Sequence, residues 1–124
     1  MAPSIICGRA FQFAVRIVKL YEQMAARGGS AHHIAKQLIR CGTSIGANAE
    51  EAQEGQSKPD YIARMSVSSK EAREAGYWLR LAVAVSAVKG SDVEWALREA
   101  DELRFMIRAA IRTARSSADR GHSG

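Results

Sequence analysis

With 124 residues, of which 47% are hydrophobic and 25% are charged, the chain is long enough for one domain with its own core and too apolar for extensive disorder. Its formal net charge of +5 makes an anionic partner worth testing, and the absence of any apolar run near about 18 residues excludes a membrane-spanning helix. Its cysteines, Cys7 and Cys41, form no CxxC pair, so we expect a reduced, cytoplasmic protein rather than a disulfide framework.

Two adjacent apolar stripes, each with residues three or four positions apart, predict the first helix at residues 9–27. The stripes consist of Phe11, Ala14, Val18, Tyr21 and Ala25, and of Phe13, Ile17, Leu20 and Met24. Gly28 and Gly29 end this helix, because glycine is favoured just beyond a helix C-terminus. Ser30 can cap a second helix, predicted at residues 31–54, which ends at Gly55. Its predicted core positions are Ile34, Leu38, Cys41, Ile45, Asn48 and Ala52.

The third helix is predicted at residues 58–89, because Ser57 can cap it, Pro59 is tolerated in its first turn and Asp60 stands at the capping-box position. Gly90 ends it, and a second capping box beginning at Ser91 starts the fourth helix, at residues 92–115. Residues 116–124 are predicted to form a flexible tail. Short connections make consecutive helices antiparallel, so we predict that residues 1–124 form one all-α domain, an antiparallel up-down-up-down four-helix bundle.

The residues that usually carry catalysis or metal binding in helical bundles are missing. Di-iron bundles need Glu-x-x-His pairs on two helices, and the chain has none. His32 and His33 are adjacent, so their side chains point about 100° apart on a helix and chelate poorly. We therefore predict a protein that is not an enzyme, with no metal site and no cofactor.

Polar residues instead follow the predicted core stripes of the second and third helices. Because buried carboxylates and amides need partners, we expect these residues to bond one another or Arg40 across the helix pair. They form either a ligand site or a structural network that fixes helix register, and the network is the favoured interpretation. The set is Ser44, Asn48, Glu51, Ser68, Glu71 and Glu74. Gly42, Gly46 and Gly76 are expected to let helix backbones approach closely.

Large aromatic residues give a second indication of contacts. Tyr77 and Trp78 are neighbours and cannot both face the core, and Trp95 follows a predicted turn. Such residues lie either at subunit contacts of a homo-oligomer or at a rim half covered by a loop.

A family resemblance is carried by five stretches of the sequence: Gln37 to Arg40, Thr43 to Ala52, Ser57, Lys70 to Glu74, and Tyr77 to Leu79. Together they resemble the four-helix bundle protein family, and the resemblance extends from about Phe11 to Ile111. The family includes proteins encoded in intervening sequences of bacterial large-subunit ribosomal RNA genes and the accessory variability protein of diversity-generating retroelements. The resemblance implies a homopentamer with a basic surface, and for the retroelement member a reverse transcriptase and nucleic acid as partners. Ala52 and Gly46 depart mildly from the family pattern.

The net charge and this resemblance together favour a homo-oligomeric binding protein associated with RNA or DNA, or with a ribonucleoprotein, through phosphate contacts. Arg104, Arg108, Arg112 and Arg115 are spaced to form one basic stripe on the fourth helix. The alternative is a protein-interaction scaffold for a polypeptide such as a reverse transcriptase, and a ligand carrier or enzyme that uses the polar residues is a third possibility. The predicted nucleic-acid contacts are Arg16, Lys19, Lys36, Arg40, Arg104, Arg108, Arg112 and Arg115.

Overall fold

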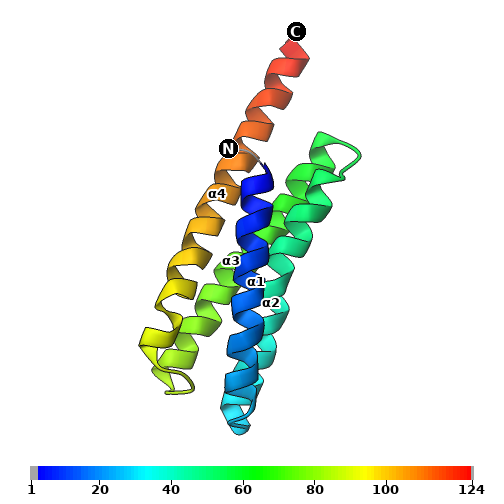
Figure 1. Cartoon of the computed structure of the whole chain (residues 1–124). Helices are drawn as coiled ribbons and strands as arrows, with labels where there is room; N and C mark the ends of the chain where they lie inside the picture. Colours follow the sequence, from blue (N-terminus) through cyan, green and yellow to red (C-terminus); the bar gives the residue numbers. More distant parts are fainter. Residues whose placement is uncertain (1–2, 124) are drawn as a thin grey trace.

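Four helices make up the computed structural model, which describes the backbone of residues 3–123 and the side chains of residues 5–117. They are α1 (Pro3–Ala25), α2 (Gly29–Gln53), α3 (Lys58–Ala84) and α4 (Gly90–Ser123), and the described residues include no strand. Each helix packs against the next and α4 packs against α1, whereas the pairs α1–α3 and α2–α4 do not meet. The helices therefore occupy the four corners of an up-and-down bundle (Figure 1), which confirms the predicted fold class.

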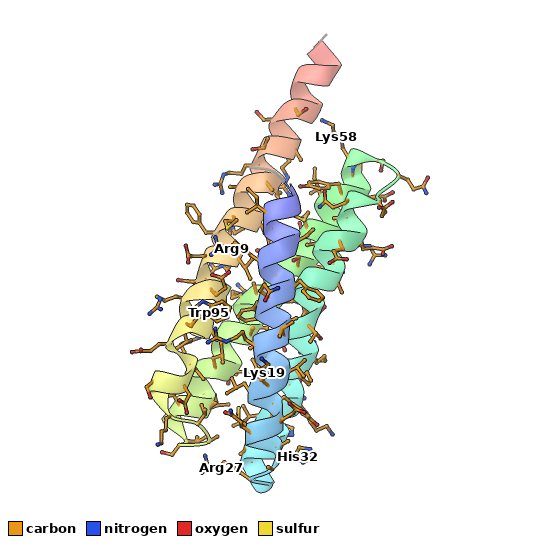
Figure 2. The ribbon with its side chains drawn as sticks, viewed as in Figure 1. Arg9, Lys19, Arg27, His32, Lys58 and Trp95 are labelled. Atoms are coloured by element: carbon orange, nitrogen blue, oxygen red, sulfur yellow. The ribbon has the colours of Figure 1, made fainter. Side chains whose placement is uncertain are left out.

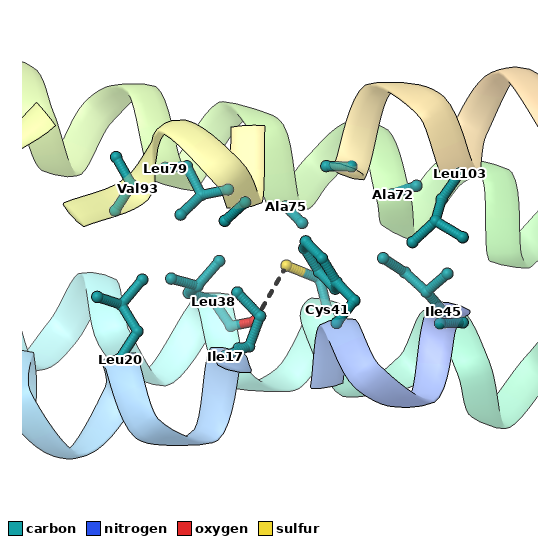
Figure 3. Packing of buried hydrophobic residues seen from close by; sticks show 14 of the residues in the cluster. Ile17, Leu20, Leu38, Cys41, Ile45, Ala72, Ala75, Leu79, Val93 and Leu103 are labelled. Carbon is teal, nitrogen blue, oxygen red and sulfur yellow. Dashed lines mark hydrogen bonds between the residues drawn. The ribbon is translucent and has the colours of Figure 1, made fainter. Parts of the chain in front are cut away.

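The core runs along the bundle axis and draws on all four helices. On α1 it consists of Phe13, Ile17, Leu20 and Met24 together with Ile6 and Ala10. Leu38, Cys41 and Ile45 of α2 face Ala72, Ala75 and Leu79 of α3 and Leu103 of α4 across this core (Figure 3). The other predicted stripe of α1 is turned outward, with Phe11 57% and Val18 39% exposed. Tyr21 of the same stripe is half-buried against the core, so the two stripes are buried unequally.

Two glycines set the distance between α1 and α2. A Cβ atom added at Gly42 would lie 2.9 Å from Ile17 Cγ2, and one added at Gly46 would lie 3.3 Å from Ala10 Cβ. The predicted close approach is thus correct for both residues. It is wrong for Gly76, where an added Cβ atom would meet nothing within 4 Å. Gly76 lies instead beside an open hollow between α3 and α4.

Helix α3 ends at Ala84, before the predicted limit of residue 89. A C-terminal cap without glycine ends it. Ser86 adopts a left-handed conformation with φ 59°. The Ser86 N–H donates to the Val83 carbonyl at 3.0 Å and the Ala87 N–H donates to the Ala82 carbonyl at 2.8 Å, which is the Schellman pattern. Arg27, in the turn after α1, also donates to the carbonyls of Ser86 and Ala87.

The two end helices are longer than predicted. Helix α1 begins at Pro3 rather than residue 9, since proline suits a first helical turn and Ile6 is fully buried in the core. Helix α4 continues through the segment predicted as a flexible tail, as far as Ser123, and Gly124 lies outside the described residues. No proline or glycine interrupts this segment before Gly121. The end of α4 projects beyond the other helices (Figure 1).

Candidate nucleic-acid interface

The predicted polar network is divided into three separate groups of bonds. Asn48 Nδ2 donates to the carbonyl and hydroxyl oxygens of Ser44, both at 2.9 Å. The Ser68 hydroxyl donates to the Ile45 carbonyl at 2.7 Å and so joins α3 to α2. Glu51 is exposed and contributes to neither group.

The third group is centred on Arg40, which bridges α2 to α3. Its guanidinium pairs with Glu71 at 3.4 Å and with Glu74, which also accepts a 3.1 Å bond from Trp78 Nε1. In the part of the chain whose side chains are described, no buried polar side-chain atom lacks a hydrogen-bond partner. Ser68 and Arg40 thus join α2 to α3, whereas Asn48 bonds within α2.

Helix α1 is joined to α4 by two arginines, Arg9 and Arg16. Figure 2 labels Arg9 on α1 and Trp95, the partner of Arg16, on α4. Arg9 donates to both carboxylate oxygens of the buried Glu99, at 2.8 and 2.5 Å, and to Glu102 at 3.2 Å. The hydrogen bond to Glu99 raises the pKa of Arg9 above its ordinary value. Arg16 lies 4.3 Å from the ring centre of Trp95 and makes a cation–π contact there. Trp95 in turn stacks on Phe13 of the core.

The eight predicted nucleic-acid contacts do not form one surface. Arg40 is paired with carboxylates, and Arg16 is held on Trp95. Lys19 and Lys36 are exposed but lie on α1 and α2, and α2 stands diagonally across the bundle from α4. The structure brings together only the four that share α4: Arg104, Arg108, Arg112 and Arg115.

These four belong to a larger surface on the outer side of α3 and α4. An open hollow of about 680 Å³ follows the outside of α4, and hollows of about 430 and 370 Å³ follow the line where α3 meets α4. We define the arginine surface by the arginines that line these hollows: Arg73, Arg80, Arg98, Arg104, Arg108, Arg112 and Arg115.

Sequence reasoning missed three members of the arginine surface. Arg73 and Arg80 are seven positions apart and so share one face of α3, a spacing that could have been noticed. What could not be known is that this face adjoins the basic stripe of α4. Arg98 lies seven positions before Phe105, on the same side of α4 as Arg112.

The positive charge of the arginine surface is largely uncompensated. Among the described residues, no ion pair includes any of the seven arginines. Two carboxylates line the same hollows, Asp101 and Glu102, and Glu102 already pairs with Arg9. Ser66 and Ser69 add hydroxyl groups beside Arg108 and Arg112. Guanidinium and hydroxyl donors in this combination suit phosphate oxygens.

The described residues offer neither a metal-binding cluster nor a membrane-spanning helix. No group of three or more His, Cys, Asp or Glu side chains is placed to hold a metal ion. Over the same part of the chain, no helix has the length and apolar character that crossing a bilayer requires.

Comparison with known proteins places the chain in a family. The model of the 23S rRNA-intervening sequence protein family matches residues 4–109. No curated protein matches the chain. Among solved structures, it is similar to a protein of unknown function from the S23 ribosomal protein family of Bacteroides thetaiotaomicron, with 32% identity and a TM-score of 0.80 over 86% of this chain and 97% of that one. The resemblance inferred from residues such as Ile45, Asn48 and Glu51 is thereby confirmed, and the chain belongs to the 23S rRNA-intervening sequence protein family.

Proposed function

We propose that the protein is a non-enzymatic, homo-oligomeric, cytoplasmic protein that binds nucleic acid, with RNA as the first candidate, through the arginine surface. The observation that supports the proposal is the absence of carboxylate partners for the seven arginines of α3 and α4, within the part of the chain described. Neither the family description nor the solved relative states what is bound. The proposal therefore rests on the arginine surface.

The geometry favours contacts with phosphates rather than with base edges. From Arg98 to Arg115 the arginines extend along about 25 Å of α4, at about 1.5 Å per residue. They line open hollows on the outer side of α3 and α4, so a strand can follow α4 and meet guanidinium groups along it. Phosphate contacts release counterions, so affinity should fall with salt, with a slope of about −0.7 per phosphate contacted on a single strand.

Fluorescence anisotropy with nuclease-treated protein and a labelled RNA tests the proposal directly. The double variant Arg108→Gln/Arg112→Gln should weaken binding and reduce the salt slope by about 1.4, for two lost phosphate contacts. Lys36→Gln, which removes one positive charge away from the arginine surface, is the control, because Lys36 is exposed on α2, diagonally across the bundle from α4. Affinity that does not change between about 50 and 200 mM salt would refute the proposal, and so would an equal loss in the control.

Self-association is proposed from a second feature, the outward apolar stripe of α1. Phe11 and Val18 are exposed and are seven positions apart, so they lie on the same side of the helix, with the half-buried Ala14 between them. A second copy of the chain is the proposed occupant, in the pentamer that the family resemblance implies. Light scattering should give a mass near five chains, and Phe11→Glu/Val18→Glu should reduce it to one. A native protein with the mass of one chain would contradict this assembly.

The alternative, a scaffold for a polypeptide partner such as a reverse transcriptase, has support from Tyr77. Its ring is 50% exposed on α3, and Arg80 lies 5.9 Å from its centre. An aromatic ring beside an arginine is typical of protein-binding hot spots. A scaffold would retain a defined protein after nuclease treatment and would show no RNA affinity of its own. Loss of the partner on nuclease treatment would exclude this alternative.

A further inference from the structure

Phe105 is the most exposed large hydrophobic side chain among the residues described, with 72% of its surface accessible. It lies on the outside of α4, where it lines the hollow of about 680 Å³ together with members of the arginine surface. Arg98 and Arg112 stand seven positions before and after it, and Arg108 stands three positions after it. These spacings place the three arginines on the same side of the helix as the ring, about 5 to 10 Å along the axis.

Packing of the bundle does not explain this phenylalanine. The core positions nearest to it on α4 are filled by Leu103, Met106 and Ile107, all of which are buried. Within the described residues the two cation–π contacts use Trp95 and Tyr77, so no arginine covers the ring of Phe105. An aromatic face is therefore presented to solvent in a hollow lined by four arginines and two carboxylates, Asp101 and Glu102, of which Glu102 is paired with Arg9.

We propose that Phe105 stacks on an unpaired base of a single-stranded nucleic acid whose phosphates contact the flanking arginines. This inference rests on the proposed function and adds the class of ligand to it. Bases in a duplex are already stacked on one another, so only a single strand or loop can offer a base face to the ring. The ring is open to a base and the arginines lie on both sides of it along α4, as a strand that passes over the helix requires.

A second copy of the chain is a poorer occupant for the same ring. If two copies met face to face at Phe105, the arginine surfaces of both would be brought close together, and like charges oppose such an isologous contact. A polyanion relieves this repulsion, whereas a second basic chain increases it. The charge around Phe105 thus favours a nucleic acid over a face-to-face contact of two copies, and the light-scattering control below tests a contact with any other face.

The test compares two RNA probes by fluorescence anisotropy: a uridine oligomer of about 16 nucleotides and a blunt duplex of the same length. Phe105→Ala should weaken binding of the oligomer about 5- to 100-fold, because a stacked base is lost. Its affinity for the duplex should not change, and its salt slope should not change because no charge is removed. Phe105→Trp should retain binding of the oligomer, and Phe105→Leu should lose it as alanine does, since leucine is apolar but has no ring.

Controls separate the two proposals from each other and from self-association. Far-UV circular dichroism should be unchanged in all Phe105 variants, because this exposed side chain contributes little to the fold. If Phe105→Ala binds the oligomer as the native protein does while Arg108→Gln/Arg112→Gln binds weakly, the stacking inference is refuted and the proposed function stands. If the arginine variant also binds normally, both fail. A lower mass by light scattering for Phe105→Ala would assign Phe105 to a subunit contact and overturn the inference.

Discussion

Gly42→Ala tests how closely α1 and α2 approach each other. The new Cβ atom would lie 2.9 Å from Ile17 Cγ2, 3.0 Å from Ile17 Cγ1 and 3.3 Å from Ile17 Cβ. Ile17 is fully buried, and a β-branched side chain in a helix has essentially one rotamer, so it cannot turn aside. The substitution must therefore move α1 away from α2 along the line where their backbones are closest.

The expected effect is the difference between two opposing contributions. Replacing glycine with alanine inside a helix stabilises by about 1 kcal/mol, because alanine loses less backbone entropy on folding. Overpacking of a tight core costs about 1–3 kcal/mol. Because all three contacts are with one immobile side chain, we expect the second contribution to dominate and the free energy of unfolding to fall, by up to about 2 kcal/mol.

Gly76→Ala is the matched control, since it makes the same chemical change inside a helix where the added Cβ atom meets nothing within 4 Å. It should stabilise the protein by about 0.5–1 kcal/mol. Urea unfolding followed by circular dichroism, at one protein concentration because association affects stability, measures both variants. In an Ile17→Ala background, Gly42→Ala should become neutral or stabilising. Changes of the same sign in Gly42→Ala and Gly76→Ala would refute the argument.

Three further predictions concern the loop after α3, the contact between α1 and α4, and the buried thiol. Ser86→Gly should raise the free energy of unfolding by about 0.5–1 kcal/mol in urea unfolding, because glycine adopts a φ of 59° without strain, and a loss of stability would contradict the Schellman cap. Arg9→Met should lower it by about 1–2 kcal/mol, because Glu99 loses its partner, and Glu99→Gln should restore part of the loss in the double variant. Burial raises the pKa of Cys41 to about 12, so the folded state holds this proton after the unfolded chain has lost it. Stability should therefore be unaffected by this thiol below about pH 8.5 and fall from there towards pH 12, and Cys41→Ala should show a smaller fall across the same range.

Much of the fold was predictable because helix ends and core spacings are local properties. Ser57 accepts a 3.3 Å bond from the Asp60 N–H, as the predicted cap requires. The end of α3 was not predictable, because a serine occupies the left-handed position where glycine is usual, and a bond from Arg27, in the turn after α1, supports it. The core side of α1 was not predictable either, because both of its stripes have helical spacing and only the position of α2 decides between them.

The candidate site depends on tertiary pairing in the same way. The spacing of Arg104, Arg108, Arg112 and Arg115 predicts a stripe from one helix alone, and the structure places these four together. Whether an arginine is available for a ligand is decided by acids elsewhere in the chain. The sequence allowed Arg40 two roles, as a partner of the polar residues and as a nucleic-acid contact, and in the structure Glu71 and Glu74 of α3 pair with it.

The distribution of carboxylates over the helix interfaces therefore explains where the positive charge is concentrated. Glu71 and Glu74 form ion pairs with Arg40 between α2 and α3. Glu99 and Glu102 form ion pairs with Arg9 between α1 and α4. The contact between α1 and α2 is made by glycines and apolar residues. No comparable acids are paired along the outer edge of α3 and α4 in the described residues, and the arginines there keep their charge. A modest net charge of +5 can thus produce a strongly basic surface, because the opposite charges cancel at two interfaces and not at this edge.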